Sequence, residues 1–557
     1  MKALRMRRLL LGVFSVLILL TGSVISLTLF YQDPVLKSAH ATNIDTPVPL
    51  FHPSSGLAHE NQLPGTTAWQ LDAHVNLNFI QGYTATVSTL PDTLVPLYIS
   101  SYAPTTFTVD VYRIGWYHGL GGHLYYRSPP IESLVQGIWT PYNGLEGCPT
   151  CTTDPVTHLV ETHWQSNYTL PVGDWPSGVY LLKLVADNHA ENEIPLVIRE
   201  AHPQAAALAN ISVNTYQAYN LWGGFSLYHS DRKETALGVK VAATKVSFNR
   251  PYDRSGGVGD LLAWDIHMIR WMERSALDVA YTTDVDISEH PEQLLQHRVV
   301  IVMAHDEYWT KAMRDGMENA RDHGVSLGFF GANAAYWQNR YEPDAEQHPD
   351  RVITCYKVST KTAASDPMFA IDPSVVTTTW RDPLVNRPES ELLGLEYLSL
   401  VPSKALPDWV VDAAPDPYIA AAGLQPDEHV KGGLVGYEYD GIISLLHTPP
   451  QLHVIAASPL INTYGRPQVA MSAYYFAKSG AMVFDAGTMW WADALDNGSP
   501  LYAYQQNFIN SNTKIMALTY HLISAMLAAT PAAPGSGATA SFSAERCATQ
   551  CFVFPAI

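Results

Sequence analysis

A run of apolar residues near the middle of the chain, VVIVMA at 299–304, ends at the polar and aromatic sequence HDEYW at 305–309. Alternate side chains of an extended chain point to the same side, so His305 and Glu307 would face the same way. A histidine beside a carboxylate can transfer protons, and either group can bind a metal ion. A hydrogen-bonded pair at the protein surface is the simpler interpretation of these two residues alone.

Two other polar groups follow apolar runs that resemble strands. The sequence NTYQAY at 214–219 follows a predicted strand that ends near Val213, and Asn333 follows another. Ligands of open parallel sheets bind at the carboxyl ends of the strands, so we expect the three groups to meet at one edge. Each group also has a structural interpretation. Asn333 can form a turn, the aromatic rings can pack in the core, and Asp306 or Thr310 can cap the following helix.

The elements that must position these groups alternate between strand and helix after about residue 203. Strand patterns occur in HRVVIVMA, VSLGFFGA and GAMVFDAG, and helical spacing occurs in LLAWDIHMIRWMERSA, TKAMRDGMENARDHG and NFINSNTKIMALTYHLISAML. Such alternation is typical of a sheet with helices on its faces. We therefore predict an α/β domain at 201–530 with a mostly parallel sheet flanked by helices.

The preceding region, residues 67–200, has a different pattern. Short strand-like segments such as TFTVDVYRI, SGVYLLKLVA and EIPLVI are separated by clusters of Gly, Pro, Asp and Asn, and no long helical period occurs. This pattern predicts an immunoglobulin-like β-sandwich. The chain is therefore expected to be multidomain.

The N-terminus, residues 1–41, resembles a signal-anchor or a signal peptide. Four basic residues within the first eight precede 22 uncharged residues at 9–30, and an Ala-His-Ala sequence at 39–41 is a candidate cleavage site. The uncharged length suits a transmembrane helix, and the basic flank predicts that the bulk of the chain lies outside the cytoplasm. We expect an extracytoplasmic protein, either membrane-anchored or secreted, with a linker at 42–66 and a flexible tail at 531–557.

Composition narrows the classes of partner. Acidic residues outnumber basic ones by 52 to 33 in the 557 residues, giving a net charge of −19. Binding to nucleic acid needs a basic surface, so nucleic acid is not an expected partner.

The close cysteine pairs GCPTC (Cys148, Cys151) and CATQC (Cys547, Cys551) predict local disulfides, with a shared zinc site as the alternative, and Cys355 is expected to be buried. The sequence leaves the oligomeric state open, with a homo-oligomer among the alternatives.

Four segments together resemble a known family. NTYQAYNLWGGFSLY, KVSFNRPY, AHDEYW and GANAAYW are similar to the C-terminal region of the N,N-dimethylformamidase large (beta) subunit, over about residues 203–520. GWYHGLGG and DWPSGVYLLKL resemble the N-terminal part of dimethylformamidase-like proteins. The resemblance implies a linear amide hydrolase with a mononuclear iron, expected to be ferric, that is held by two tyrosines and one glutamate.

The resemblance also implies roles for individual residues. Glu307 matches the glutamate ligand, Tyr219 the first tyrosine and Tyr228 the second. Tyr216 and Tyr308 are rivals for the second tyrosine. Only nine positions separate Tyr219 from Tyr228, whereas the corresponding segment of the family is longer.

Three further residues match the family's active site. His305 matches a histidine beside the glutamate ligand, Asn333 an active-site asparagine, and Glu438 in VGYEYD a further active-site glutamate.

These assignments agree with the chemistry of the groups. Phenolate and carboxylate oxygens suit a hard cation, which would activate water for attack on an amide carbonyl. Asn333 can donate a hydrogen bond to the oxyanion, Glu438 can protonate the leaving amine, and His305 can orient Glu307 or shuttle a proton. We therefore expect an exported, iron-dependent hydrolase of a small amide.

Two alternatives remain on the same fold. The 14 Trp and 30 Tyr residues also suit a cell-surface protein that binds glycans, and a non-catalytic structural protein is the second alternative. No GxSxG, Walker or HExxH motif is present, so the sequence does not support a serine hydrolase, a P-loop enzyme or a zincin.

Overall fold

The computed structural model describes residues 51, 55–72, 76–230, 241–253, 257–402, 404–405, 407–496 and 511–529. The predicted membrane-spanning segment at 9–30 and the pair Cys547 and Cys551 lie outside these residues. Within the described part of the chain, no helix is long and apolar enough to cross a bilayer. Cys148 and Cys151 form a disulfide, and Cys355 is buried and free, as predicted.

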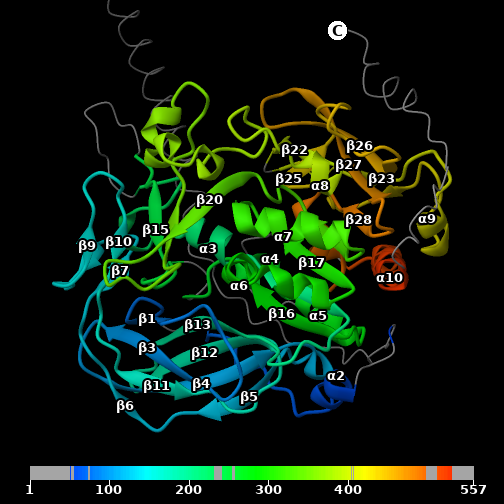
Figure 1. The fold of residues 1–557 in the computed structure, drawn as a ribbon. Coiled ribbons are helices and arrows are strands. Elements are labelled where there is room, and N and C mark those ends of the chain that lie inside the picture. Colours follow the sequence, from blue (N-terminus) through cyan, green and yellow to red (C-terminus); the bar gives the residue numbers. More distant parts are fainter. Residues whose placement is uncertain are drawn as a thin grey trace, which may run out of the picture.

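Two facing sheets form the main body of the N-terminal region (Figure 1). The smaller sheet has the order β1 (Ile80–Thr84), β3 (Leu94–Ser101), β11 (Tyr168–Pro171). The larger sheet has the order β2 (Ser88–Thr89), β13 (Glu191–Ile198), β12 (Gly178–Ala186), β4 (Thr106–Ile114), β5 (Gly122–Arg127), and β6 (Ile131–Glu132) also pairs with β4.

A shared hydrophobic core holds these two sheets together. Val95, Leu97 and Ile99 alternate along β3 and pack against Phe107 and Val109 of β4 in one cluster of buried residues. This period of two buries one face of each strand, as in a sandwich. The immunoglobulin-like topology itself stays a prediction.

A seven-stranded sheet dominates the rest of the molecule. Its order is β16 (Val279–Thr283), β14 (Ala207–Ile211), β17 (Val299–Ala304), β19 (Ser326–Gly331), β28 (Met482–Asp485), β27 (Pro467–Phe476), β26 (His453–Ile461). The pairings from β16 to β28 are parallel, and the two that involve β27 are antiparallel. The sheet is therefore mixed. We predicted a mostly parallel sheet and did not foresee the antiparallel hairpin of β26 and β27 at its edge.

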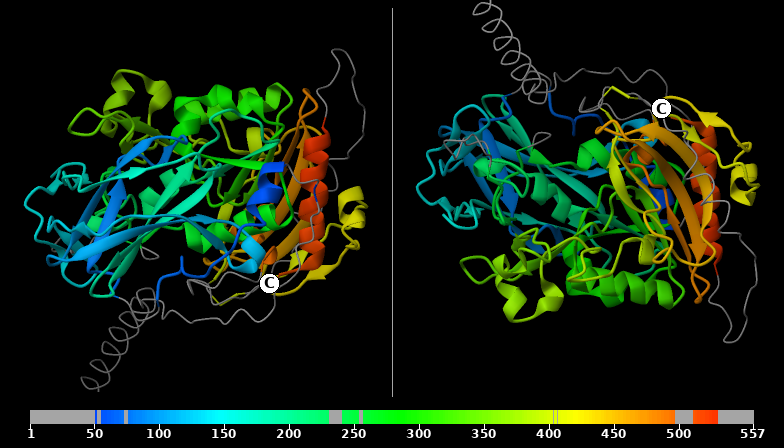
Figure 2. Two further views of the ribbon diagram at one scale, coloured as in Figure 1. Left: turned by 90° about the horizontal axis from the view of Figure 1, so that it is seen from below. Right: turned by 90° about the horizontal axis from the view of Figure 1, so that it is seen from above.

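Helices cover both faces of this sheet. Val300 and Val302 of β17 share a buried cluster with Met313 and Met317 of α7 (Lys311–Asp322). The alternate β17 residues Val299, Ile301 and Met303 belong to the cluster that contains α10 (Thr513–Ala528). A strand buried on both faces needs a continuous apolar run, which explains VVIVMA. Both views of Figure 2 show α10 in red, at the end of the molecule away from β1 and β3.

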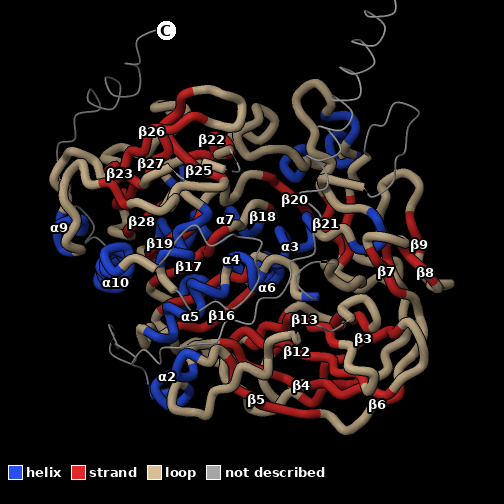
Figure 3. The backbone as a smooth tube through the Cα atoms, turned by 180° about the vertical axis from the view of Figure 1, so that it is seen from behind, coloured by secondary structure: helices blue, strands red, loops and turns tan. Residues whose placement is uncertain are grey.

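Figure 3 shows the remaining short elements, among them α2 beside β5 of the sandwich. The helices are α2 (Ser55–Glu60), α3 (Val213–Tyr219), α4 (Leu261–Trp264), α5 (Ile266–Arg274), α6 (Asp284–Glu289), α8 (Ser390–Leu393) and α9 (Pro417–Ala421). The strands are β7 (Ile138–Thr140), β8 (Gly144–Glu146), β9 (Thr152–Thr153), β10 (Val160–Glu161), β15 (Lys245–Ser247), β18 (Tyr308–Thr310), β20 (Trp337–Glu342), β21 (Val352–Thr354), β22 (Glu396–Leu400), β23 (Trp409–Val410), β24 (His429–Val430) and β25 (Glu438–Gly441).

A buried ion pair joins the sandwich to the α/β region. Arg113 of β4 donates from Nη1 to Glu273 Oε2 over 2.9 Å and from Nη2 to Glu273 Oε1 over 2.8 Å. The two side chains are 2% and 0% exposed, and Tyr281 also donates to Glu273. Removal of either partner of such a bidentate pair destabilises the fold, because the remaining charge is then buried without compensation.

We expect Glu273→Gln to lower the free energy of unfolding by about 3–5 kcal/mol, because it leaves the Arg113 guanidinium buried without a counter-charge. Urea unfolding of the full chain, followed by tryptophan fluorescence, measures this loss. Lys311→Ala is the matched control. Both side chains of its pair with Asp315 are exposed, 40% and 43%, so its loss should cost at most about 1 kcal/mol. Equal losses in the two variants would contradict the importance of the buried pair.

Candidate active site

The carboxyl ends of β14, β17 and β19 bring the predicted polar groups to one edge of the large sheet. β17 pairs in parallel with β14 on one side and β19 on the other. The strands β17 and β19 approach closely at their ends, since a Cβ at Gly331 would lie 1.9 Å from the carbonyl oxygen of Ala304. Only glycine fits there. His305 follows Ala304 directly, and Asn333 lies two residues after Gly331.

The segment after β14 differs from our prediction. We expected a strand to end near Val213, but β14 ends at Ile211 and residues Val213–Tyr219 form α3. This helix turns the side chain of Tyr219 toward the end of β17. The helix was missed because almost all of its residues are buried, so it shows no amphipathic pattern.

Two tyrosines donate hydrogen bonds to the two oxygens of one carboxylate. Tyr219 donates to Glu307 Oε2 over 2.9 Å, and Tyr228 donates to Glu307 Oε1. The two phenol rings stack with centroids 4.5 Å apart. The structure therefore brings together the three residues that the sequence suggested as ligands.

The rival tyrosines are placed differently. The hydroxyl of Tyr216 donates to Asp265, away from Glu307. Tyr308 is buried beside Tyr228, with ring centroids 6.2 Å apart, and no hydrogen bond joins its hydroxyl to Glu307. This geometry favours Tyr228 as the second tyrosine of the group.

His305, Asn333 and Glu438 form a second polar group that adjoins the first. His305 Nε2 lies 3.2 Å from Glu438 Oε2 and 3.5 Å from Glu307 Oε2, so it bridges the two carboxylates. Asn333 Nδ2 donates to Glu438 Oε2 over 2.9 Å, while the buried amide oxygen of Asn333 has no hydrogen-bond partner in the described structure. All three side chains are buried.

Backbone contacts fix the direction of Glu307. Its N–H donates to the hydroxyl of Thr215 in α3 over 2.9 Å, and its carbonyl accepts from the N–H groups of Tyr336 and Trp337. Helix α3 and the segment after β19 therefore both hold the backbone of Glu307 in place.

Asn333 is held by an acidic side chain that we did not foresee. The backbone N–H of Asn333 donates to Asp440 Oδ1 over 2.9 Å and to Oδ2 over 3.2 Å. Asn333 has φ of 57°, a left-handed conformation that asparagine tolerates better than most residues. Asp440 thus fixes a strained backbone and, with it, the direction of the Asn333 side chain.

Asp306, which lies between His305 and Glu307, points away from the site. Asn210 Nδ2 donates to Asp306 Oδ2 over 2.8 Å and to Asp284 Oδ1 over 2.6 Å. The cap of α7 is Thr310, whose hydroxyl accepts from the N–H of Met313.

Lys357 lies near the tyrosines and was missed by sequence reasoning. Its Nζ lies 3.2 Å from the centroid of the Tyr228 ring and donates to the carbonyl of Leu227. Burial lowers the pKa of Lys357 to about 8. A single lysine after a short strand carries no pattern, so only the folded structure could reveal this contact.

Burial and close approach shift the pKa values of the titratable side chains in the site. Burial raises the pKa of Tyr219 and of Tyr228 well above 10, and the charge of Glu307 raises both further. Burial also raises the pKa of Glu307, while the charge of His305 lowers it. Burial alone would lower the pKa of His305, but the charges of Glu438 and Glu307 raise it to about 9.

The oxygen donors of this site fit a hard cation. Both phenol protons are directed at one carboxylate, and a bound cation can replace these protons and reverse the rise in pKa. Phenolate and carboxylate oxygens suit ferric iron better than a soft metal. In the described residues, no group of three or more His, Cys, Asp and Glu side chains is arranged to hold a metal ion, so a metal here would depend on the tyrosine oxygens.

Comparisons with known proteins place these residues in a family context. A family profile described as "N,N-dimethylformamidase beta subunit-like, C-terminal" matches residues 108–506, which include every candidate residue described above. The N,N-dimethylformamidase beta subunit of Paracoccus aminophilus is 25% identical over 290 residues, covering 44% of this chain and 36% of that protein. The N,N-dimethylformamidase beta subunit of Alcaligenes sp is 30% identical over 98 residues, covering 17% of this chain and 13% of that protein.

The alignments thus span about a third or less of these relatives' own length. A solved structure, the cycloisomaltooligosaccharide glucanotransferase of Paenibacillus sp., matches with 6% identity over 52% of this chain and 36% of that one. Its TM-score of 0.15 carries no argument about fold or function. The family profile, in contrast, covers most of the chain. The chain therefore belongs to the N,N-dimethylformamidase beta subunit-like, C-terminal family.

Proposed function

We propose that the protein is an exported, iron-dependent hydrolase of a carbon–nitrogen amide bond in a small molecule. One observation carries the proposal: the phenols of Tyr219 and Tyr228 both donate to the carboxylate of Glu307 at the carboxyl edge of the sheet. The names of the relatives support an amide substrate. A purely structural protein gains nothing from burying so many acidic groups around one point.

In this proposal Tyr219, Tyr228 and Glu307 would hold a mononuclear ferric iron. Bound there, the iron would supply polarisation of the amide carbonyl and activation of water. The hydroxyl of Thr215 and the backbone N–H groups of Tyr336 and Trp337 hold Glu307 in the position that the metal would need.

The second polar group provides the proton transfers and the hydrogen bonds. His305 lies between Glu307 and Glu438, and with its pKa raised to about 9 it holds a proton that it can pass to Glu438 and then regain from the attacking water. Glu438 can then protonate the nitrogen of the leaving amine. Asn333, held by Asp440, can donate its second N–H to the oxygen that becomes negative in the transition state.

The proposed location rests on the N-terminal segment. Basic residues followed by the uncharged stretch at 9–30 favour export as an anchored or secreted protein. The Cys148–Cys151 disulfide supports an oxidising compartment. A homo-oligomer remains compatible with the proposal.

We expect Tyr219→Phe, Tyr228→Phe and Glu307→Gln each to reduce the iron content of the purified full chain to about a tenth or less, because each removes one of only three ligands. Metal analysis and the visible absorption of an iron–phenolate pair measure this loss. Tyr102→Phe, at a tyrosine that is 61% exposed, is the control and should retain full iron. Full occupancy in the three variants would show that the ligand assignment is wrong.

We expect the full chain to hydrolyse at least one compound in a panel of small formamides and acyl amides. Asn333→Ala should lower kcat by about 10²–10³-fold with an unchanged iron content, because one donor to the oxyanion is lost. Asn319→Ala, on the exposed side of α7, is the matched control. Wild-type kcat in Asn333→Ala would contradict the proposed role.

We expect Glu438→Gln to discriminate between leaving groups. Hydrolysis of alkyl amides should slow by about 10²–10⁴-fold, because their amines must be protonated to leave. Anilides, whose amines are much less basic, should lose less. An equal loss of kcat for the two classes would argue that Glu438 does not protonate the leaving group.

A further inference from the structure

A cavity lies between the sandwich and the α/β region, separate from the candidate active site. Its volume is about 240 Å³, enough for one small ring-shaped molecule. Tyr83 of β1 and Tyr98 of β3 line it from the sandwich, while the segment from Asp344 to Arg351 lines it from the other side. No candidate residue of the proposed active site lines it.

One wall of the cavity is aromatic. Tyr98 is half-buried and stacks on Tyr83, with centroids 4.9 Å apart and planes 7° from parallel. Trp164, which also lines the cavity, lies 5.7 Å from the Tyr83 ring. Such a wall offers a flat apolar surface to a ligand.

A buried guanidinium with unused donors is also part of the lining. Arg351 is only 8% exposed; its Nε donates to Asn249 Oδ1 over 2.9 Å and its Nη2 to the carbonyl of Thr84 over 3.2 Å. Its Nη1 donates to no residue in the described structure, and none of the ion pairs there includes Arg351. Solvent reaches this Nη1, so it is free to donate a hydrogen bond to a ligand in the cavity that accepts one.

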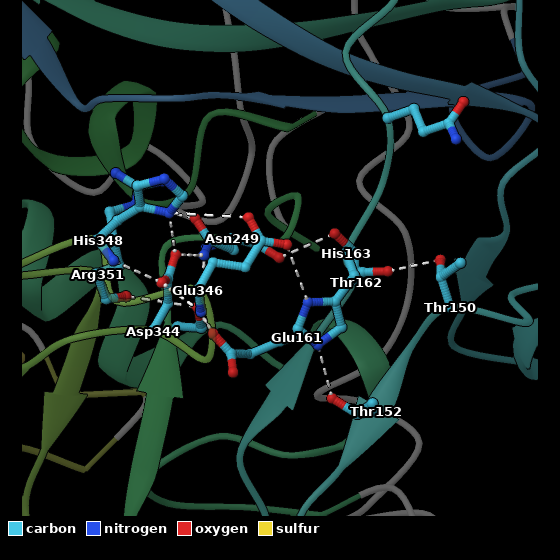
Figure 4. A network of polar contacts seen from close by, with 12 residues as sticks. Thr150, Thr152, Glu161, Thr162, His163, Asn249, Asp344, Glu346, His348 and Arg351 are labelled. Atoms are coloured by element: carbon cyan, nitrogen blue, oxygen red, sulfur yellow. Dashed lines mark hydrogen bonds and ion pairs between the residues drawn. The ribbon is translucent and has the colours of Figure 1, made fainter.

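Two of the carboxylates that line the cavity, Asp344 and Glu346, have polar partners nearby (Figure 4). Asp344 accepts from Asn249 over 2.8 Å and lies 2.9 Å from Nδ1 of His348. Glu346 lies between two histidines, 3.8 Å from His163 and 3.9 Å from His348. The cavity therefore presents both donors and acceptors, with positive and negative groups side by side.

We propose that this cavity binds a neutral, polyhydroxylated ring of the monosaccharide class. The apolar face of such a ring can stack on Tyr98, and a hydroxyl oxygen can accept from Arg351 Nη1. Hydroxyl protons on the other side can be donated to the carboxylates at the opening, including Glu289 and Asp350. An anion would be repelled by the lining carboxylates, whereas hydroxyl groups can both donate to these carboxylates and accept from Arg351.

Calorimetric titration of the full chain tests this site. The probes are the methyl glycosides of glucose, galactose, mannose and N-acetylglucosamine, with choline and alanine as the charged alternatives. We expect at least one glycoside to bind. Tyr98→Ala and Glu289→Gln should each weaken its binding about tenfold, because they remove the stacking surface and a hydroxyl acceptor respectively.

The controls separate this site from the proposed active site. Tyr102→Ala removes an exposed tyrosine that does not line the cavity, so it should leave glycoside binding unchanged. The iron content of Tyr98→Ala should stay at the wild-type value, so the two proposals can fail independently. Three results would overturn the inference: no glycoside binding, binding that neither variant weakens, or tighter binding of choline or alanine than of every glycoside.

Discussion

The parallel pairing of β17 with β19 is the constraint on which the arrangement of the candidate active site depends. It fixes His305, Glu307 and Asn333 at adjacent points of one edge, and the close approach at Gly331 leaves no room for a side chain between the two strand ends. The acidic groups then have to share a small, buried volume. Their charges can be stabilised there only by mutual hydrogen bonds, by His305 or by a cation.

Much of this edge could be predicted from the sequence, because a strand that is buried on both faces leaves a continuous apolar run. VVIVMA and SLGFFG both show such a run, and the first polar residue after each marks the end of a strand. The multidomain organisation was predictable for a similar reason. Apolar and polar residues alternate along the strands of the sandwich, whereas strands and helices alternate along the chain after it. The first pattern suits a sheet packed on a sheet, and the second suits a sheet covered by helices.

Features that depend on distant segments could not be predicted. The helix α3 is buried almost all round, so its sequence has no helical pattern to detect. Asp440 and Lys357 come from segments far along the chain from Asn333 and Tyr228, and their contacts arise only from folding. The cavity beside Arg351 is another example, since its lining comes from six separate parts of the chain and none of them carries a motif.

The ion pair of Arg113 with Glu273 limits how the gene for such a protein can be truncated or recombined. One partner belongs to a sandwich strand and the other to a helix of the α/β region, and both lie within the segment that the family profile matches. A gene fragment that began after the sandwich would encode a chain in which Glu273 lacks its partner Arg113. Recombination that exchanged one region alone would break the same contact, so selection is expected to keep the two regions as a single heritable unit.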